Sequence, residues 1–241
     1  MILLGQYLLG LGNHLIRVET WMASKARNAF DENMEDVARL LALHEGAGGN
    51  GPGRRYGLEV LNKSAVVLLT SYWESYCEDI AEEALELLVS KIKSPDELPE
   101  SIRKLIVKEL KEDKHDFAIW QLADDNWRVY LKSRLENYKS TRNRNFNTPK
   151  HAQVDELFET ALGIKGISNS WLWDKTTAAT AKKKLNNFVE LRGAIAHRGK
   201  GEGSVTKKNV TDFKDLISTL AARTGGAVNR HIHKITGEKL F

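Results

Sequence analysis

Apolar residues recur at spacings of three and four along most of the chain, and the strict alternation typical of a half-buried strand is nearly absent. This period predicts amphipathic helices. The clearest stripe lies within residues 61–92, where it predicts one face of a long, buried central helix. Its members are Ala65, Leu69, Tyr72, Tyr76, Ile80, Ala84 and Leu87. The predicted fold class is therefore all-α, a helical bundle with long central helices and additional flanking helices.

The other side of this central helix is acidic. Glu74, Glu78, Glu82 and Glu86 follow one another at i, i+4 spacing. Like charges at this spacing repel one another mildly on a helix. The pattern therefore predicts either a basic neighbour or open water beside these four carboxylates.

Further helices are predicted from the same spacing and from cap, proline and glycine signals. They are expected at 15–43, after Ser94 with Pro95 and Pro99 near the start, at 117–138, from Thr148 and Pro149 to Gly163, from Asp174 or Thr176 to about residue 198, and after residue 204 with a break at Gly225 and Gly226. Residues 46–53 are expected to be a glycine-rich break and 139–150 a basic connector. These signals divide the chain into an N-terminal segment 1–56, a helical core 57–222 and a C-terminal tail 223–241, within one domain overall.

One helix carries two polar residues in an unexpected place. Along "KKKLNNFVELRGAIAHRGK" the apolar stripe reaches Arg192 at a position where the period predicts a leucine, and His197 follows five residues later. On an ideal helix these two positions are about 140° apart, so the side chains flank the small residues Gly193 and Ala196 and leave a groove. A structural interpretation pairs Arg192 with an internal carboxylate, Glu74 or Glu78, and lets His197 cap the helix end. A functional interpretation makes the two residues a site.

Composition limits the class of protein that carries this pair. With 241 residues and 41% apolar content the chain can bury a full-sized core. A single cysteine, Cys77, excludes an internal disulfide and a cysteine-built zinc site, and it fits a reducing cytoplasm. The opening "MILLGQYLLGLG" is too short and too interrupted to predict a signal peptide or a membrane span. The net charge of +4 mixes 36 basic with 32 acidic residues, so charge alone identifies no partner.

Two tempting motifs fail on context. "GAGGNG" at 46–51 has the spacing of a dinucleotide fingerprint, but a predicted helix precedes it where a strand is required. His231 and His233 have the wrong spacing to share one helix face, and no third ligand lies near them in sequence, so they are interpreted as part of a solvated tail. The sequence therefore predicts neither a metal site nor a bound cofactor.

Two segments together carry a resemblance to a known family. "RGAIAHRG" near the end of one helix and "AVVLLTSYWESYCEDIAEEAL" on an earlier one resemble the HEPN superfamily of all-helical domains, specifically its RiboL-PSP branch. The resemblance covers most of residues 57–222. The family signature is Arg, a polar residue, three to five variable residues and His; Arg192 and His197 match it, while Gly193 stands at the polar position. Glu74 is carried over as a weaker candidate, expected to face Arg192.

The resemblance implies metal-independent endoribonuclease activity in a toxin or an antiviral defence effector. RNA supplies its own nucleophile, the 2′-hydroxyl, so the protein needs a base and a cation that holds the phosphate. His197 suits the first role, and the forked guanidinium of Arg192 suits the second. The expected products carry 2′,3′-cyclic phosphate and 5′-hydroxyl ends. Family members generally pair two such helices across a two-fold axis, so a homodimer is expected, with an antitoxin or other defence protein as a possible further partner.

RNA binding is expected to draw on neighbouring cations. The candidates are Arg198, Lys200, Lys182, Lys183 and Lys184 around the same helix, and Arg142 and Arg144 in "TRNRNF". The lysine run is equally compatible with a solvated helix face. Two other function classes stay open: an inactive HEPN-like module that binds RNA or nucleotide or dimerises within a defence or toxin–antitoxin complex, and a purely structural bundle.

Overall fold

The computed structural model describes residues 23–48, 57–115, 117–145, 149–198 and 204–241. These residues form α-helices and short 3-10 helices with a single isolated β-bridge, so the predicted all-α class is confirmed. The α-helices are α1 (Lys25–Gly48), α2 (Glu59–Lys91), α3 (Glu100–Glu112), α4 (Asn126–Asn145), α5 (His151–Leu162), α6 (Ala178–Arg198) and α7 (Lys207–Thr236). The 3-10 helices are η1 (Pro95–Glu97), η2 (Ala118–Leu122) and η3 (Ile167–Ser170).

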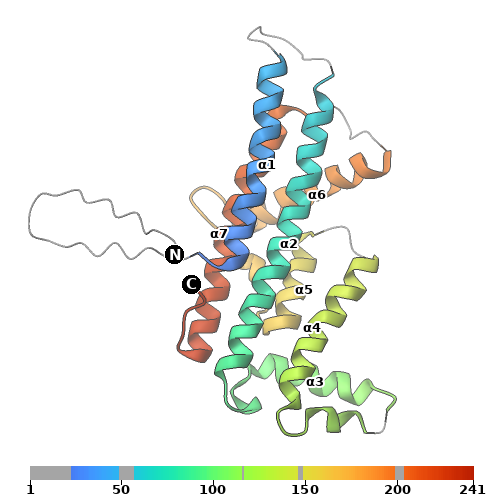
Figure 1. Cartoon of the computed structure of the whole chain (residues 1–241), viewed down its shortest axis with the longest axis vertical. Helices are drawn as coiled ribbons and strands as arrows, with labels where there is room; N and C mark the ends of the chain where they lie inside the picture. Colours follow the sequence, from blue (N-terminus) through green and yellow to red (C-terminus); the bar gives the residue numbers. More distant parts are fainter. Residues whose placement is uncertain (1–22, 49–56, 116, 146–148, 199–203) are drawn as a thin grey trace, which may run out of the picture.

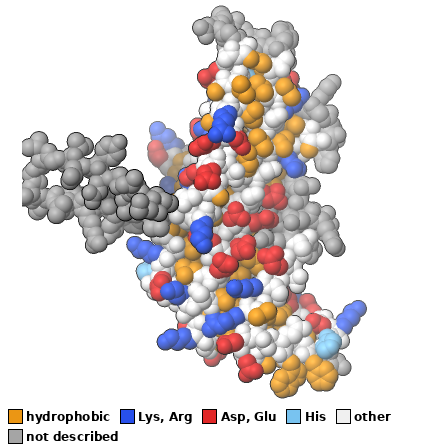
Figure 2. Space-filling model, viewed as in Figure 1, with side chains coloured by type: hydrophobic (Ala, Val, Ile, Leu, Met, Phe, Trp, Pro, Cys, Tyr) orange, Lys and Arg blue, Asp and Glu red, His pale blue; other side chains and the backbone are white. Residues whose placement is uncertain are grey.

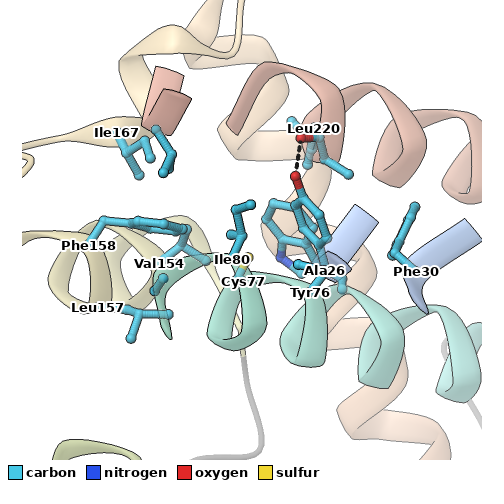
Figure 3. Close-up of a cluster of buried hydrophobic side chains, with 14 of the residues drawn as sticks. Ala26, Phe30, Tyr76, Cys77, Ile80, Val154, Leu157, Phe158, Ile167 and Leu220 are labelled. Atoms are coloured by element: carbon cyan, nitrogen blue, oxygen red, sulfur yellow. Dashed lines mark hydrogen bonds between the residues drawn. The ribbon is translucent and has the colours of Figure 1, made fainter. Parts of the chain in front are cut away.

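Helix α2 is the centre of the bundle. Helices α1 and α7 run alongside it, α5 packs on its lower half, and α6 crosses it (Figure 1). Figure 3 shows Phe30 of α1, Ile80 of α2, Phe158 of α5 and Leu220 of α7 around one apolar core. The predicted stripe of α2 is confirmed at its buried members, which are Ala65, Leu69, Tyr76, Ile80 and Ala84. Because helices pack on several sides of α2, residues outside this stripe, such as Trp73, are fully buried as well.

Two buried indoles connect α2 and α7 to the segments between them. The rings of Trp73 and Trp171 meet edge to face with their centroids 5.8 Å apart. The indole N–H of Trp73 donates to the carbonyl of Pro149 at 3.2 Å, and that of Trp171 donates to the hydroxyl of Thr224 at 2.9 Å. Burying an indole costs little free energy when its single N–H donor has a hydrogen-bond acceptor. These bonds fix the start of α5 against the middle of α2.

Helix α7 runs without interruption through Gly225 and Gly226, so the predicted break at these residues is wrong. Tyr76 of α2 supplies the physical reason. Its hydroxyl donates to the carbonyl of Ala221 at 2.8 Å. A Cβ placed on Gly225 would lie 2.6 Å from the hydroxyl oxygen of Tyr76. The glycine therefore permits a close approach between two helices, and the buried Val228 beyond it keeps the helix packed.

Gly225→Ala is expected to lower the free energy of unfolding by about 1–3 kcal/mol, because the added methyl group displaces the buried hydroxyl of Tyr76. Gly226→Ala is the matched control. Its Cβ would meet only the flexible end of Arg230 at 3.4 Å, so the better helix propensity of alanine should raise stability by up to about 1 kcal/mol. Urea unfolding followed by circular dichroism measures both, and equal effects of the two substitutions would contradict this account.

The region between α3 and α4 differs from the prediction. The helix expected at 117–138 begins only at Asn126, after the short η2, and it continues to Asn145 through part of the predicted connector 139–150. Asp124 has a positive φ of 52°, which ends η2 and separates it from α4. In η2 the spacing also fails to form an apolar stripe, because Ala118 is buried while its neighbours Phe117, Ile119 and Trp120 are mostly exposed.

Several other boundaries are confirmed or corrected. Ser94 is an N-cap as predicted, with a complete capping box, but it caps η1, and α3 begins after Pro99. Gly163 ends α5 in the left-handed conformation, as expected. Helix α1 continues to Gly48, beyond the predicted end at residue 43 and into the predicted break at 46–53. Residues 15–22 of the first predicted helix, and Thr148, lie outside the described residues.

The interpretation of His231 as part of a solvated tail is also wrong. This residue lies within α7, and its Nε2 is 3.0 Å from the carbonyl oxygen of Leu162. Burial lowers the pKa of His231 below its ordinary value, although the bond to Leu162 opposes that effect. His231 therefore joins α7 to the end of α5 and plays no part in a metal site among the described residues.

Candidate functional site

Helix α6 is held in place by its own stripe and by the start of α5. Its buried residues are Ala181, Leu185, Val189 and Ile195. The amide oxygen of Asn186 accepts from the backbone N–H of His151 at 3.2 Å, and Lys150 forms an ion pair with Glu190 at 2.7 Å. These contacts fix the middle of α6 against α5. The last two turns of α6, which begin with Arg192, come directly after these contacts in the sequence.

Arg192 continues the buried stripe of α6, as its position in the sequence predicts. Its side chain is half-buried, and its Nε is shielded from solvent. The Oε1 of Glu78 on α2 is shielded in the same way. Arg192, Glu74 and Glu78 each take part in polar or electrostatic interactions. A guanidinium in such an environment keeps its charge and needs compensation, so this turn of α6 is a partly desolvated cationic position.

The acidic row of α2 approaches this position at its Glu74 end, whereas Glu82 and Glu86 line a hollow beside α1. Helices α2 and α6 are in contact, and the start of α5 touches both, through Pro149 on Trp73 and through Lys150 on Glu190. The turn of α2 that carries Glu74 is therefore near the turn of α6 that carries Arg192. Glu74 is half-buried. Figure 2 shows acidic side chains on the face of the molecule where α1 and α2 lie side by side. That Glu74 faces Arg192 stays a prediction.

His197 and Arg198 belong to the last turn of α6, while their side chains and all of Lys200 lie outside the described part of the structure. On a regular helix, positions 192 and 197 are about 140° apart.

Gly193, at the polar position of the family signature, lies in open space. A Cβ added there meets no atom within 4 Å among the described residues. Among the described residues, packing therefore leaves room for a Cβ at this position.

The other basic candidates lie at two places. Lys183 is exposed on the first half of α6, as expected for a residue on a solvated face. Arg142 and Arg144 belong to the last turns of α4, and their side chains are outside the described residues. Figure 1 shows the C-terminal ends of α4 and α6 on the same side of the view, with α6 projecting from the bundle.

The described residues contain no group of three or more His, Cys, Asp or Glu side chains arranged to hold a metal ion. None of the described helices combines the length and the apolar character that a bilayer span requires.

The described residues form an all-helical domain. A family model described as RiboL-PSP-HEPN matches residues 29–229, and the chain belongs to this family. The match begins within α1, earlier than the resemblance at 57–222 predicts, and extends through most of α7. No curated protein and no solved structure matches the chain.

Proposed function

We propose that the protein is a metal-independent endoribonuclease of the HEPN type, with Arg192 and His197 as its catalytic residues. The observation that carries this proposal is the half-buried Arg192 on the apolar stripe of α6, in a chain of this family, with a histidine five residues later. An apolar stripe tolerates a permanent charge poorly unless that charge has a use or a fixed partner. Membership of the HEPN family favours a catalytic use of the charge on Arg192.

In the proposed reaction His197 accepts the proton of an RNA 2′-hydroxyl. The 2′-oxygen then bonds to phosphorus, the P–O5′ bond breaks, and O5′ takes up a proton as it leaves. Arg192 donates two parallel hydrogen bonds to the phosphate oxygens as negative charge builds on them. Glu74 is assigned the weaker role of orienting the guanidinium. The products are a 2′,3′-cyclic phosphate and a 5′-hydroxyl.

The active form is proposed to be a homodimer. The two residues leave α6 about 140° apart, so a second copy of the helix is needed to bring an arginine and a histidine to one phosphate. The surface is suited to such contact, because Leu191 and Ala194 are half-buried and Ala196 is exposed on the last turns of α6. Figure 2 also shows hydrophobic side chains gathered over the upper parts of α1 and α2, where Leu43 and Val60 are mostly exposed.

Substrate binding is assigned to cations on α6, after it and at the end of α4. They are Arg198, Lys200 and Lys183, with Arg142 and Arg144 from the end of α4. Each contact to a phosphate makes RNA affinity dependent on salt without reading its sequence. In the cell the protein is proposed to act in the cytoplasm as a toxin or antiviral effector, restrained by an antitoxin or another defence protein.

Gly193 favours a second candidate function. A glycine provides no polar side chain beside Arg192, and an inactive relative that binds RNA or nucleotide, or dimerises within a defence complex, does not need one. RNA binding without cleavage would select this candidate.

Incubation of the purified protein with total RNA in excess chelator tests the proposal. RNA should be cleaved, because the mechanism uses side chains alone, and cleavage should be lost in Arg192→Ala and in His197→Ala while their circular dichroism stays that of the wild type. Lys93→Ala, at an exposed residue just beyond the C-terminal end of α2, is the control. Strict dependence on added magnesium, or undiminished cleavage by both variants, would place the site elsewhere.

A further inference from the structure

An open pocket of about 530 Å³ lies between α6, α7 and the turn that precedes α6. It is distinct from Arg192 but close to it, because Lys184 and Phe188 line the pocket and Arg192 follows Phe188 by one helical turn. Its size falls within the range of about 300–1,000 Å³ usual for small-molecule sites.

Aromatic and aliphatic side chains form the apolar part of this pocket. Phe188 packs flat on the buried Phe213, with ring centroids 4.3 Å apart and an interplanar angle of 9°, yet Phe188 alone of the two lines the pocket. Trp173 lines it from the other segment. Two backbone hydrogen bonds between Trp173 and Thr176, of 3.1 and 2.9 Å, close the turn and hold the indole there. The pocket therefore contains two positioned aromatic rings, which suit a flat aromatic ligand.

The polar groups of the pocket divide into a pair and two single charges. Lys208 and Asp212, four residues apart on α7, bind each other at 2.8 Å, so their charges largely compensate. Lys184 and Asp215 also line the pocket, and neither side chain forms a hydrogen bond or ion pair within the described residues. One free acceptor and one free cation thus accompany the aromatic rings.

We propose that this pocket binds one unpaired guanine base, stacked on its aromatic rings, read by Asp215, with the attached phosphate held by Lys184. A carboxylate accepts hydrogen bonds only, and guanine presents two adjacent donors, N1–H and the N2 amino group, on its pairing edge. Adenine presents an acceptor at N1, which a carboxylate repels. Stacking favours any base, so Asp215 supplies the selectivity.

Two sources can present this base, an unpaired stretch of RNA or a free guanine nucleotide. Where the base belongs to RNA, the inference rests on the proposed ribonuclease function, and the pocket then holds a base beside the phosphate at Arg192. Binding to the pocket can be measured without any cleavage, so the two proposals fail independently.

Calorimetric titration of the full chain with GMP and AMP is the test. Wild-type protein should bind GMP at least about tenfold more tightly than AMP. Asp215→Asn should weaken GMP binding about tenfold, since one of two hydrogen bonds from guanine loses its acceptor and the other loses its charge. AMP binding should stay equal or strengthen. Glu32→Gln on α1, an exposed residue with the same change of charge, should alter neither.

The charge removed in Asp215→Asn distinguishes recognition of guanine from simple attraction of phosphate. If the pocket only attracted phosphate, removing the carboxylate of Asp215 would strengthen GMP and AMP binding alike, and that result would overturn the proposal. Binding of agmatine in place of GMP would also overturn it, because the occupant would then be a cationic side chain of a protein.

Short 2′-deoxy oligonucleotides identify the source of the base. Tighter binding of a strand with one guanine than of GMP indicates RNA, and no gain indicates the free nucleotide.

Discussion

His197→Ala is expected to lower the rate of RNA cleavage by about 100- to 10,000-fold, the usual contribution of a general base, while RNA affinity stays close to that of the wild type. A neutral imidazole contributes little to ground-state binding, because phosphates are held by cations. Affinity is best measured on a substrate whose attacking 2′-hydroxyl is replaced by hydrogen, which stops turnover. Its dependence on salt should be unchanged in this variant, since no phosphate contact is lost.

Arg192→Lys provides the complementary measurement. Lysine keeps the charge but not the planar fork, so binding should be partly retained while cleavage falls by about 100- to 1,000-fold. The assigned roles would be reversed by a different pair of results. Loss of binding in His197→Ala, together with wild-type cleavage by Arg192→Lys, would make the histidine a binding residue and the arginine a structural one.

The sequence predicts the parts of this fold that depend on local periodicity. The stripe of α2 and the position of Arg192 on the stripe of α6 follow from the spacing of apolar residues, because a helix repeats its environment every turn. The all-α class follows for the same reason. Periodicity alone does not account for a charge on this stripe, for which we propose a catalytic role.

Features that depend on residues far apart in sequence could not be predicted in this way. Gly225 signals a helix break locally, but the hydroxyl of Tyr76, about 150 residues earlier, makes it a packing residue. The guanine pocket combines Trp173, Phe188 and Asp215 from three segments, none of which forms a motif. Between η2 and α4 the left-handed Asp124 interrupts a segment whose composition resembles that of a helix.

A second copy of the chain is expected to complete the catalytic site. On a regular helix, positions 192 and 197 are about 140° apart, so the proposed working pair consists of the arginine of one chain and the histidine of its partner. The protein should therefore sediment as a dimer at micromolar concentration, through a contact that includes residues 185–197. Ala194→Glu should weaken this dimer and lower cleavage in step with it, whereas Ala38→Glu on the exposed side of α1 should do neither.

Mixing the two inactive variants tests the pairing directly. Arg192→Ala and His197→Ala proteins, each inactive alone, should together recover roughly one quarter of wild-type activity, because random exchange makes half of the dimers mixed and each mixed dimer keeps one of its two pairs. Mixing either variant with the double variant should recover nothing, since no intact pair can form. Exchange is verified by copurification through two different tags. If exchange occurs and the mixture stays inactive, or if a fully active protein proves monomeric, the arginine and the histidine act within one chain, and the last turn of α6 must then depart from a regular helix to bring them together.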